Sequence, residues 1–126
     1  MPMKHALLLD DNIAQLTVRE LVLRNAQIES HVATNAQSAL ALLRSETGQA
    51  RIGVVITDHL MPGMDGVEFV RQLRSFNKEI PVIVISGLPD ADMEYAGLSV
   101  HFRVKPCDPE DLIALAKSAL EYRASA

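Results

Sequence analysis

The sequence predicts an α/β protein in which five βα units build one parallel sheet. Short apolar runs alternate with longer amphipathic stretches along the chain, which is typical of strands and helices that follow one another in turn. Three of the apolar runs end in charged side chains, and these are Asp10, Asp11, Asp58 and Lys105. Open parallel sheets keep their ligand sites at the carboxyl ends of strands. We therefore expect the four side chains to meet at one edge of the sheet.

The strands are predicted from the apolar runs. They are expected near residues 5–9, 28–33, 52–57, 81–86 and 100–104. In the third, the run Val54-Val55-Ile56-Thr57 stands directly before Asp58 and is typical of a strand that is buried on both faces.

The helices are predicted from apolar residues that recur at helical spacing. They are expected near residues 12–25, 36–46, 66–76 and 109–123. Asn12 with Gln15, and Asp65 with Glu68, have the spacing of capping boxes, and Asp108 stands before a proline at the first helical position. Between the fourth and fifth strands the glycines and Pro89 leave only residues 90–96, so the fourth helix should be short or irregular.

Composition narrows the class of protein. A chain of 126 residues fits one domain, and its net charge of -4 without a basic stripe argues against direct nucleic-acid binding. Cys107 is the only cysteine, which excludes an internal disulfide and fits a reducing compartment. The amino terminus offers neither a signal peptide nor a membrane span. We therefore expect a cytoplasmic protein.

The three aspartates predict a magnesium site. Adjacent carboxylates about 4 Å apart repel by roughly 4 kcal/mol at an effective dielectric near 20, so a counter-charge is needed. Magnesium suits a shallow site with few carboxylates, several waters and phosphate oxygens. It would also neutralise a phosphoryl group in transfer while one carboxylate attacks as the nucleophile. Asp58 is the best candidate nucleophile because it stands alone on the central strand.

Two further strand ends add groups that suit a phosphate. Lys105 offers a positive charge to phosphate oxygens, and a cis bond to Pro106 would aim it inward. Ser86 ends the fourth strand and offers a hydroxyl donor. Each residue alone is an ordinary strand exit or turn, but their order on separate strand ends is a far more specific signal.

In these residues the chain resembles the receiver domain of two-component response regulators, of the CheY-like superfamily, over nearly its full length. The matching motifs are Asp10-Asp11, Asp58 with the loop Met61-Pro62-Gly63-Met64-Asp65-Gly66, Ser86, and Lys105-Pro106. The resemblance implies a flavodoxin-like (βα)5 three-layer sandwich with strand order 2-1-3-4-5. It also implies that residues 1–126 form a single receiver domain, with no output domain in this chain.

The resemblance implies a role for each site residue. A histidine kinase or phosphotransfer protein would phosphorylate Asp58. Asp11, Asp58 and the backbone carbonyl of Leu60 would bind Mg²⁺ directly, and Asp10 would act through water. Ser86 and Lys105 would hold the phosphate. Phosphorylation would draw Ser86 inward and let Phe102, at the family's aromatic switch position, rotate into the vacated space, altering the surface around the fourth helix, fifth strand and fifth helix.

Two departures from the family pattern carry expectations. The fourth helix is shortened, and receivers commonly dimerise or signal through it, so we expect a monomer or a weak homodimer. Leu60 and Leu88 stand where a polar side chain often orients the hydrolytic water. We therefore expect slow loss of the phosphoryl group.

Three other functions are alternatives to the receiver. An aspartate-nucleophile phosphohydrolase needs a second acid two residues after the nucleophile, where this chain has Asn12 or Leu60. A nucleotide- or flavin-binding module would need a glycine-rich phosphate loop after Leu9, where the chain has two acids. A phosphorylation-independent interaction module would not need the complete set of acids, serine and lysine. Apart from its own phosphorylation and dephosphorylation, the domain is not expected to be an enzyme.

Overall fold

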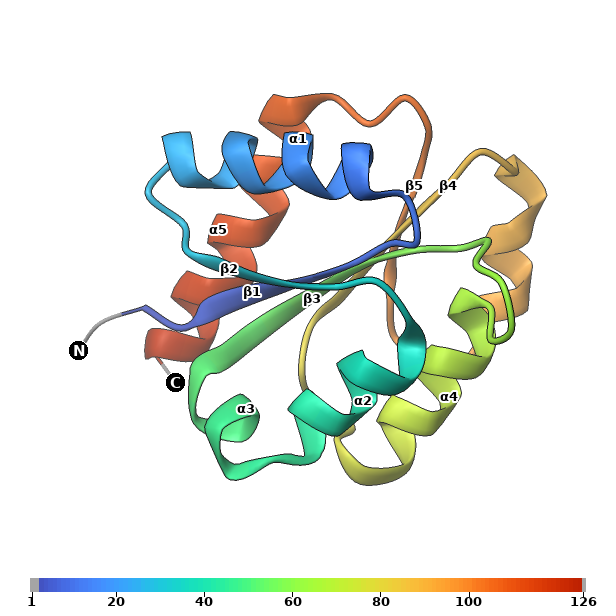
Figure 1. Ribbon diagram of the computed structural model, residues 1–126, viewed down its shortest axis with the longest axis horizontal. Coiled ribbons are helices and arrows are strands. Elements are labelled where there is room, and N and C mark those ends of the chain that lie inside the picture. Colours follow the sequence, from blue (N-terminus) through green and yellow to red (C-terminus); the bar gives the residue numbers. More distant parts are fainter. Residues whose placement is uncertain (1–2, 126) are drawn as a thin grey trace.

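The computed structural model is a five-stranded parallel sheet with helices on its two faces (Figure 1). It describes the backbone of residues 3–125 and the side chains of residues 3–121. The strands are β1 (His5–Leu9), β2 (Ser30–Ala33), β3 (Ile52–Asp58), β4 (Val82–Ser86) and β5 (His101–Val104). They lie in the order β2-β1-β3-β4-β5, and every neighbouring pair is parallel. The predicted fold and strand order are confirmed.

The sheet separates two layers of the hydrophobic core, and helices cover each layer. Helices α1 (Ile13–Asn25) and α5 (Pro109–Ser125) cover one face, and α2 (Ala36–Arg44) and α4 (Gly66–Phe76) cover the other (Figure 1). Strand β1 shows why both layers form, because Ala6 and Leu8 pack in one cluster and Leu7 and Leu9 in the other. Its alternating side chains thus bury apolar surface in two directions.

Helix starts follow the predicted capping signals. The side chain of Asn12 accepts a hydrogen bond from the Gln15 N–H at 3.1 Å, and that of Asp65 accepts one from Glu68 at 3.0 Å. Asp108 Oδ1 accepts one from the Glu110 N–H at 2.9 Å. These side chains satisfy amide groups that the first turn of a helix leaves unpaired.

The prediction of the second helix, over residues 36–46, is wrong about where the helix ends. Helix α2 ends at Arg44, and a separate short helix, α3 (Glu46–Arg51), follows it. Ser45 divides the two, because its hydroxyl donates to the Leu42 carbonyl at 2.6 Å and accepts from the Gly48 N–H at 3.0 Å. One side chain therefore ends one helix and starts the next, a local arrangement that apolar periodicity does not reveal.

The connection between β4 and β5 is a single short 3-10 helix, η1 (Pro89–Tyr95), as the glycines and proline of that segment predict. Only Ala91 and Tyr95 of this helix are buried. The loop between η1 and β5 is held by Arg74 of α4, whose guanidinium donates to the carbonyls of Leu98 at 2.9 Å and Ser99 at 3.0 Å. The same guanidinium donates to Ile80 at 2.8 Å, so one arginine joins the loops that enter β4 and β5.

We predict that Arg74→Met lowers the free energy of unfolding by about 3 kcal/mol, because several backbone carbonyls lose a charged donor together. Arg71→Met is the matched control, since Arg71 lies on the same helix and is exposed. Urea unfolding followed by circular dichroism would measure both. Equal stability of the two variants would show that the Arg74 hydrogen bonds do not hold this part of the fold.

Candidate functional site

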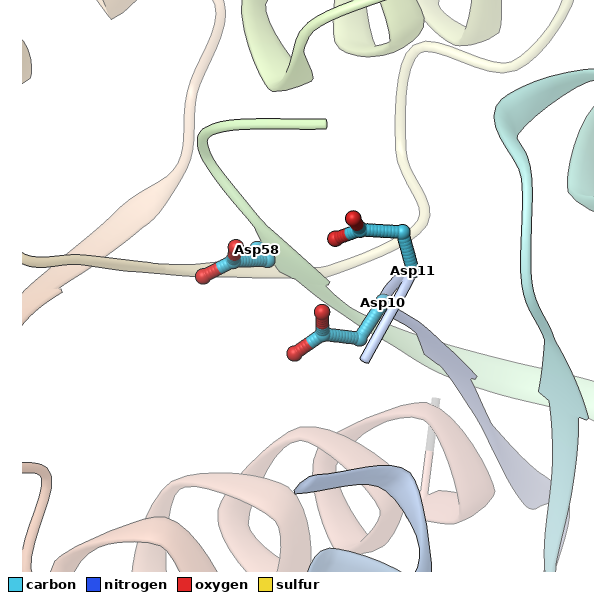
Figure 2. Close-up of side chains that lie close together, drawn as sticks. All are labelled: Asp10, Asp11 and Asp58. Atoms are coloured by element: carbon cyan, nitrogen blue, oxygen red, sulfur yellow. The ribbon is translucent and has the colours of Figure 1, made fainter. Parts of the chain in front are cut away.

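Three carboxylates meet at the carboxyl edge of the sheet. Asp10 and Asp11 follow β1, and Asp58 ends the neighbouring strand β3 (Figure 2). Each of the three offers an oxygen within 4.8 Å of the others. Asp10 and Asp58 are buried, at 1% and 6% exposure, and Asp11 is exposed. The edge predicted from the strand ends is therefore present, and its oxygen donors fit a hard divalent cation such as Mg²⁺.

Asp10 has hydrogen-bond donors on both oxygens. Its Oδ1 accepts from the Asn12 N–H at 2.9 Å, and its Oδ2 lies 3.0 Å from Arg19 Nη1 of helix α1. Burial nevertheless raises the pKa of Asp10, since the loss of water outweighs the Asn12 and Arg19 contacts, and the charge of Asp58 adds in the same direction. The cluster therefore holds an anion that burial disfavours.

Lys105 reaches Asp58 from the end of β5. Its Nζ lies 2.8 Å from Asp58 Oδ1, in an ion pair whose geometry falls short of a directional hydrogen bond. The Lys105–Pro106 peptide bond is cis. The Lys105 N–H donates to the Ser86 carbonyl at 2.7 Å, which ties the ends of β4 and β5 together. The lysine is thus beside the carboxylate that the sequence singled out.

Ser86 is buried at the end of β4, and its hydroxyl faces the following turn. Its Oγ accepts a hydrogen bond from the Leu88 N–H at 2.9 Å. Leu60 and Leu88 are exposed, at 58% and 48%. Two residues after Asp58 and two residues after Ser86, the chain thus exposes an apolar side chain.

His59 is buried, at 3% exposure, although it stands in the loop directly after β3, where side chains are commonly exposed. Its Nδ1 lies 2.7 Å from the Tyr95 hydroxyl of η1, and its Nε2 lies 3.4 Å from Glu94 Oε2. Burial raises the pKa of Tyr95, and the charges of Asp65, Glu94 and Asp58 raise it further, so the phenol keeps its proton. The Tyr95 hydroxyl and His59 Nδ1 share this hydrogen bond, and Nε2 faces Glu94.

Tyr95 links the residue next to Asp58 with the predicted switch residue. Its ring centroid lies 5.5 Å from that of His59 and 6.0 Å from that of Phe102. Phe102 is partly buried against the core cluster that contains Tyr95. Gly66 makes room for Tyr95, because a Cβ at Gly66 would lie 2.4 Å from the tyrosine hydroxyl. The rings of His59, Tyr95 and Phe102 thus form a row from the end of β3 through η1 to β5.

The sequence and the fold of this chain are similar to those of known proteins. A family model described as the response regulator receiver domain matches residues 6–117. The chain belongs to the response regulator receiver domain family.

Curated relatives include two longer proteins. The cyclic di-GMP phosphodiesterase response regulator RpfG of Xanthomonas campestris is 32% identical over 121 residues, which cover 92% of this chain and 32% of RpfG. The transcriptional regulatory protein PrrA of Mycobacterium bovis is 36% identical over 122 residues, covering 94% of this chain and 51% of PrrA. The receiver therefore spans about half or less of the length of these relatives.

Solved structures agree with the fold. A CheY-like receiver domain protein from Methanospirillum hungatei superimposes with a TM-score of 0.86 at 21% identity, covering 98% of each chain. The chemotaxis protein CheY4 of Vibrio cholerae gives a TM-score of 0.81 at 30% identity, covering 94% of this chain and all of CheY4. Among the residues described in this receiver, no helix has the length and apolar character needed to cross a membrane.

Two residues of the receiver's site region were missed by sequence reasoning. Arg19 had a signal, because Leu16 and Leu23 of the same helix are buried and Arg19 lies three residues after one and four before the other. A charged residue on that inward face would have pointed to a buried partner. Tyr95 had no comparable signal, since η1 is too short to show a periodic face.

We predict that Tyr95→Phe lowers the free energy of unfolding by about 1–2 kcal/mol, because the buried His59 Nδ1 loses its hydrogen-bond partner. The matched control is Thr17→Val, which removes a hydroxyl that bonds the Ile13 carbonyl on the exposed side of α1. Urea unfolding would measure the two losses. A loss for Tyr95→Phe no larger than that of the control would mean that the His59 contact adds nothing to stability.

Proposed function

We propose that this receiver accepts a phosphoryl group on Asp58, in a magnesium-dependent reaction, from a histidine kinase or a histidine phosphotransfer protein. The observation that carries the proposal is the position of Asp58 at the end of a central strand, 2.8 Å from Lys105 and grouped with Asp10 and Asp11. Receivers of two-component systems act in this way, and residues 1–126 supply the residue types that the reaction needs.

The residues that would hold the cation are Asp11, Asp58 and the backbone carbonyl of Leu60, with Asp10 acting through water. A bound Mg²⁺ would neutralise negative charge on the phosphoryl oxygens. The chemistry on the chain itself is a displacement in which an Asp58 oxygen attacks phosphorus as the phosphorus–nitrogen bond of the donor phosphohistidine breaks. The imidazole leaves with the bonding electron pair and is protonated by solvent.

Lys105 has two successive roles in this proposal. Before transfer its ammonium pairs with the Asp58 carboxylate, 2.8 Å from Oδ1. After transfer the aspartyl oxygen is part of an acyl phosphate, and the ammonium pairs with the phosphoryl oxygens. Ser86 would exchange its present bond from the Leu88 N–H for a bond that its hydroxyl donates to the phosphate.

Movement of Ser86 would supply the switch. Ser86 pairs in register with Val104 of β5, and Phe102 stands two residues earlier on that strand. An inward shift of Ser86 would open space for the Phe102 ring, whose inward state rests on apolar burial because it lacks a hydroxyl. Phe102 also packs 6.0 Å from Tyr95, so its rotation would alter η1 together with β5 and α5. We propose this surface as the one a downstream protein reads.

The partners in this proposal are proteins. Helix α1 exposes Ile13, Val18 and Leu21 at 68%, 60% and 53%, beside a groove of about 590 Å³ that reaches Lys105. An exposed apolar helix face next to the acceptor suits a protein donor better than a small metabolite. We propose a cytoplasmic protein that is a monomer or a weak homodimer, and that turns over no external substrate.

Intact mass tests the acceptor. The protein is incubated with MgCl₂ and acetyl phosphate, and we expect one phosphoryl adduct on the wild type and none on Asp58→Asn. Asp65→Asn is the matched control, because Asp65 caps helix α4 and should leave the adduct unchanged. Adduct on Asp58→Asn would move the acceptor elsewhere. No adduct and no magnesium binding in the wild type would favour a phosphorylation-independent interaction module.

We predict slow loss of the phosphoryl group, because Leu60 and Leu88 leave no polar side chain to orient the attacking water. Leu60→Asn or Leu88→Asn should speed the loss by roughly tenfold or more, since an oriented water is already close to its reacting geometry. The control is Val32→Asn, which replaces an exposed apolar side chain on β2 and should leave the rate of phosphoryl loss unchanged. Phosphate release after removal of the donor measures the rates, and a wild-type lifetime of seconds would contradict the prediction.

A further inference from the structure

Arg19 lies inside the acid cluster, although the proposed phosphoryl transfer makes no use of it. Its side chain comes from helix α1 and is 12% exposed. Its Nη1 donates to Asp10 Oδ2 at 3.0 Å, and its Nη2 donates to Gln15 Oε1 at 3.0 Å. The guanidinium is therefore held at two points, one on the cluster and one on its own helix, so it does not sample the surface as an unbraced arginine does.

Asp10 is the member of the cluster that this contact changes most. Its carboxylate is 1% exposed, and each oxygen already accepts one hydrogen bond, from Asn12 or from Arg19. Asp11 is exposed, and Asp58 faces Lys105 instead. Each buried carboxylate of the cluster thus has its own cationic partner: Lys105 pairs with Asp58, and Arg19 pairs with Asp10.

A cation bound among these carboxylates would meet the charge of Arg19 at short range. The oxygens of the three acids lie within 4.8 Å of one another, and Arg19 touches one of them. Coulomb repulsion between a divalent cation and a guanidinium roughly 7 Å apart lowers the affinity about tenfold even at the dielectric of water, and by more at a partly buried site. Exposed arginines repel a bound cation far less, because water and salt screen their charge.

We propose that Arg19 is the resident counter-cation of this acid cluster, which pairs with Asp10 and thereby weakens the binding of a divalent cation to Asp10, Asp11 and Asp58. The inference rests on the magnesium site of the proposed function. Arg19 acts as a positioning residue, because it touches Asp10 and no reacting atom. Gln15 is its brace, and the pair sets how much free cation is needed to fill the site.

The test is a titration of the metal-free protein with MgCl₂ at constant ionic strength, followed by the backbone amide signals near Asp58 in ¹H–¹⁵N NMR spectra. Arg19→Gln should lower the magnesium Kd about tenfold. Arg19→Lys keeps the charge and should stay close to wild type. Gln15→Ala removes only the hydrogen bond that braces Arg19, so it should lower the magnesium Kd by a smaller factor of about two to three. This variant also tests the proposal if Arg19→Gln does not fold.

The matched control is Arg24→Gln. Arg24 lies on the same helix and pairs with Glu20 at 3.7 Å, but its side chain is 69% exposed. Its loss changes the net charge by the same amount as the loss of Arg19 and should leave the magnesium Kd unchanged. A tighter Kd in Arg24→Gln equal to that in Arg19→Gln would assign the effect to net charge and overturn the proposal.

The remaining outcomes separate this inference from the proposed function. Tighter binding in Arg19→Gln with rescue by Arg19→Lys supports it. An unchanged or weaker Kd in both Arg19→Gln and Gln15→Ala, with magnesium bound by the wild type, overturns the role of Arg19 and leaves the magnesium site standing. Absence of magnesium binding in every variant overturns both proposals together.

Discussion

The parallel sheet brings Asp10, Asp11 and Asp58 to one edge, because β1 and β3 are neighbours and run in the same direction. Like charges at that spacing repel, so the surrounding structure has to oppose them. The opposition comes from three other places: Lys105 at the end of β5, Arg19 on α1 and the Asn12 N–H at the start of that helix. Much of the local design around the sheet edge follows from holding these acids together.

The sequence predicted the features that depend on short stretches of chain. Apolar runs and capping pairs are local, so the strands, most helix starts and the edge that carries Asp58 were found from them. The short η1 was found in the same way, from the glycines and the proline around it. Helix α3 was not predicted, because its start depends on Ser45. The hydrogen bonds of the Ser45 hydroxyl to Leu42 and Gly48 form only in the folded chain and leave no pattern in the sequence.

The remaining parts of the site depend on contacts between distant segments. His59 lies in the loop after β3 and is buried there, and Tyr95, 36 positions later in the chain, shares a hydrogen bond with it. Arg19 is nine residues from Asp10 and reaches it only because α1 packs back against the sheet. Such pairings are set by tertiary packing, which a single sequence reveals only through indirect signals such as a charge on a buried helix face.

The bare Cα of Gly66 has a consequence for how this receiver's sequence varies. Tyr95 occupies the volume that a side chain at Gly66 would need, and the backbone carbonyl of Asp58 borders the same space at 2.9 Å from a Cβ there. A methyl group at position 66 would therefore clash with the backbone at the end of β3 as well as with Tyr95, and a smaller residue at position 95 would relieve only the second clash. Glycine should therefore recur at position 66 across homologues, whatever side chain they carry 29 positions later.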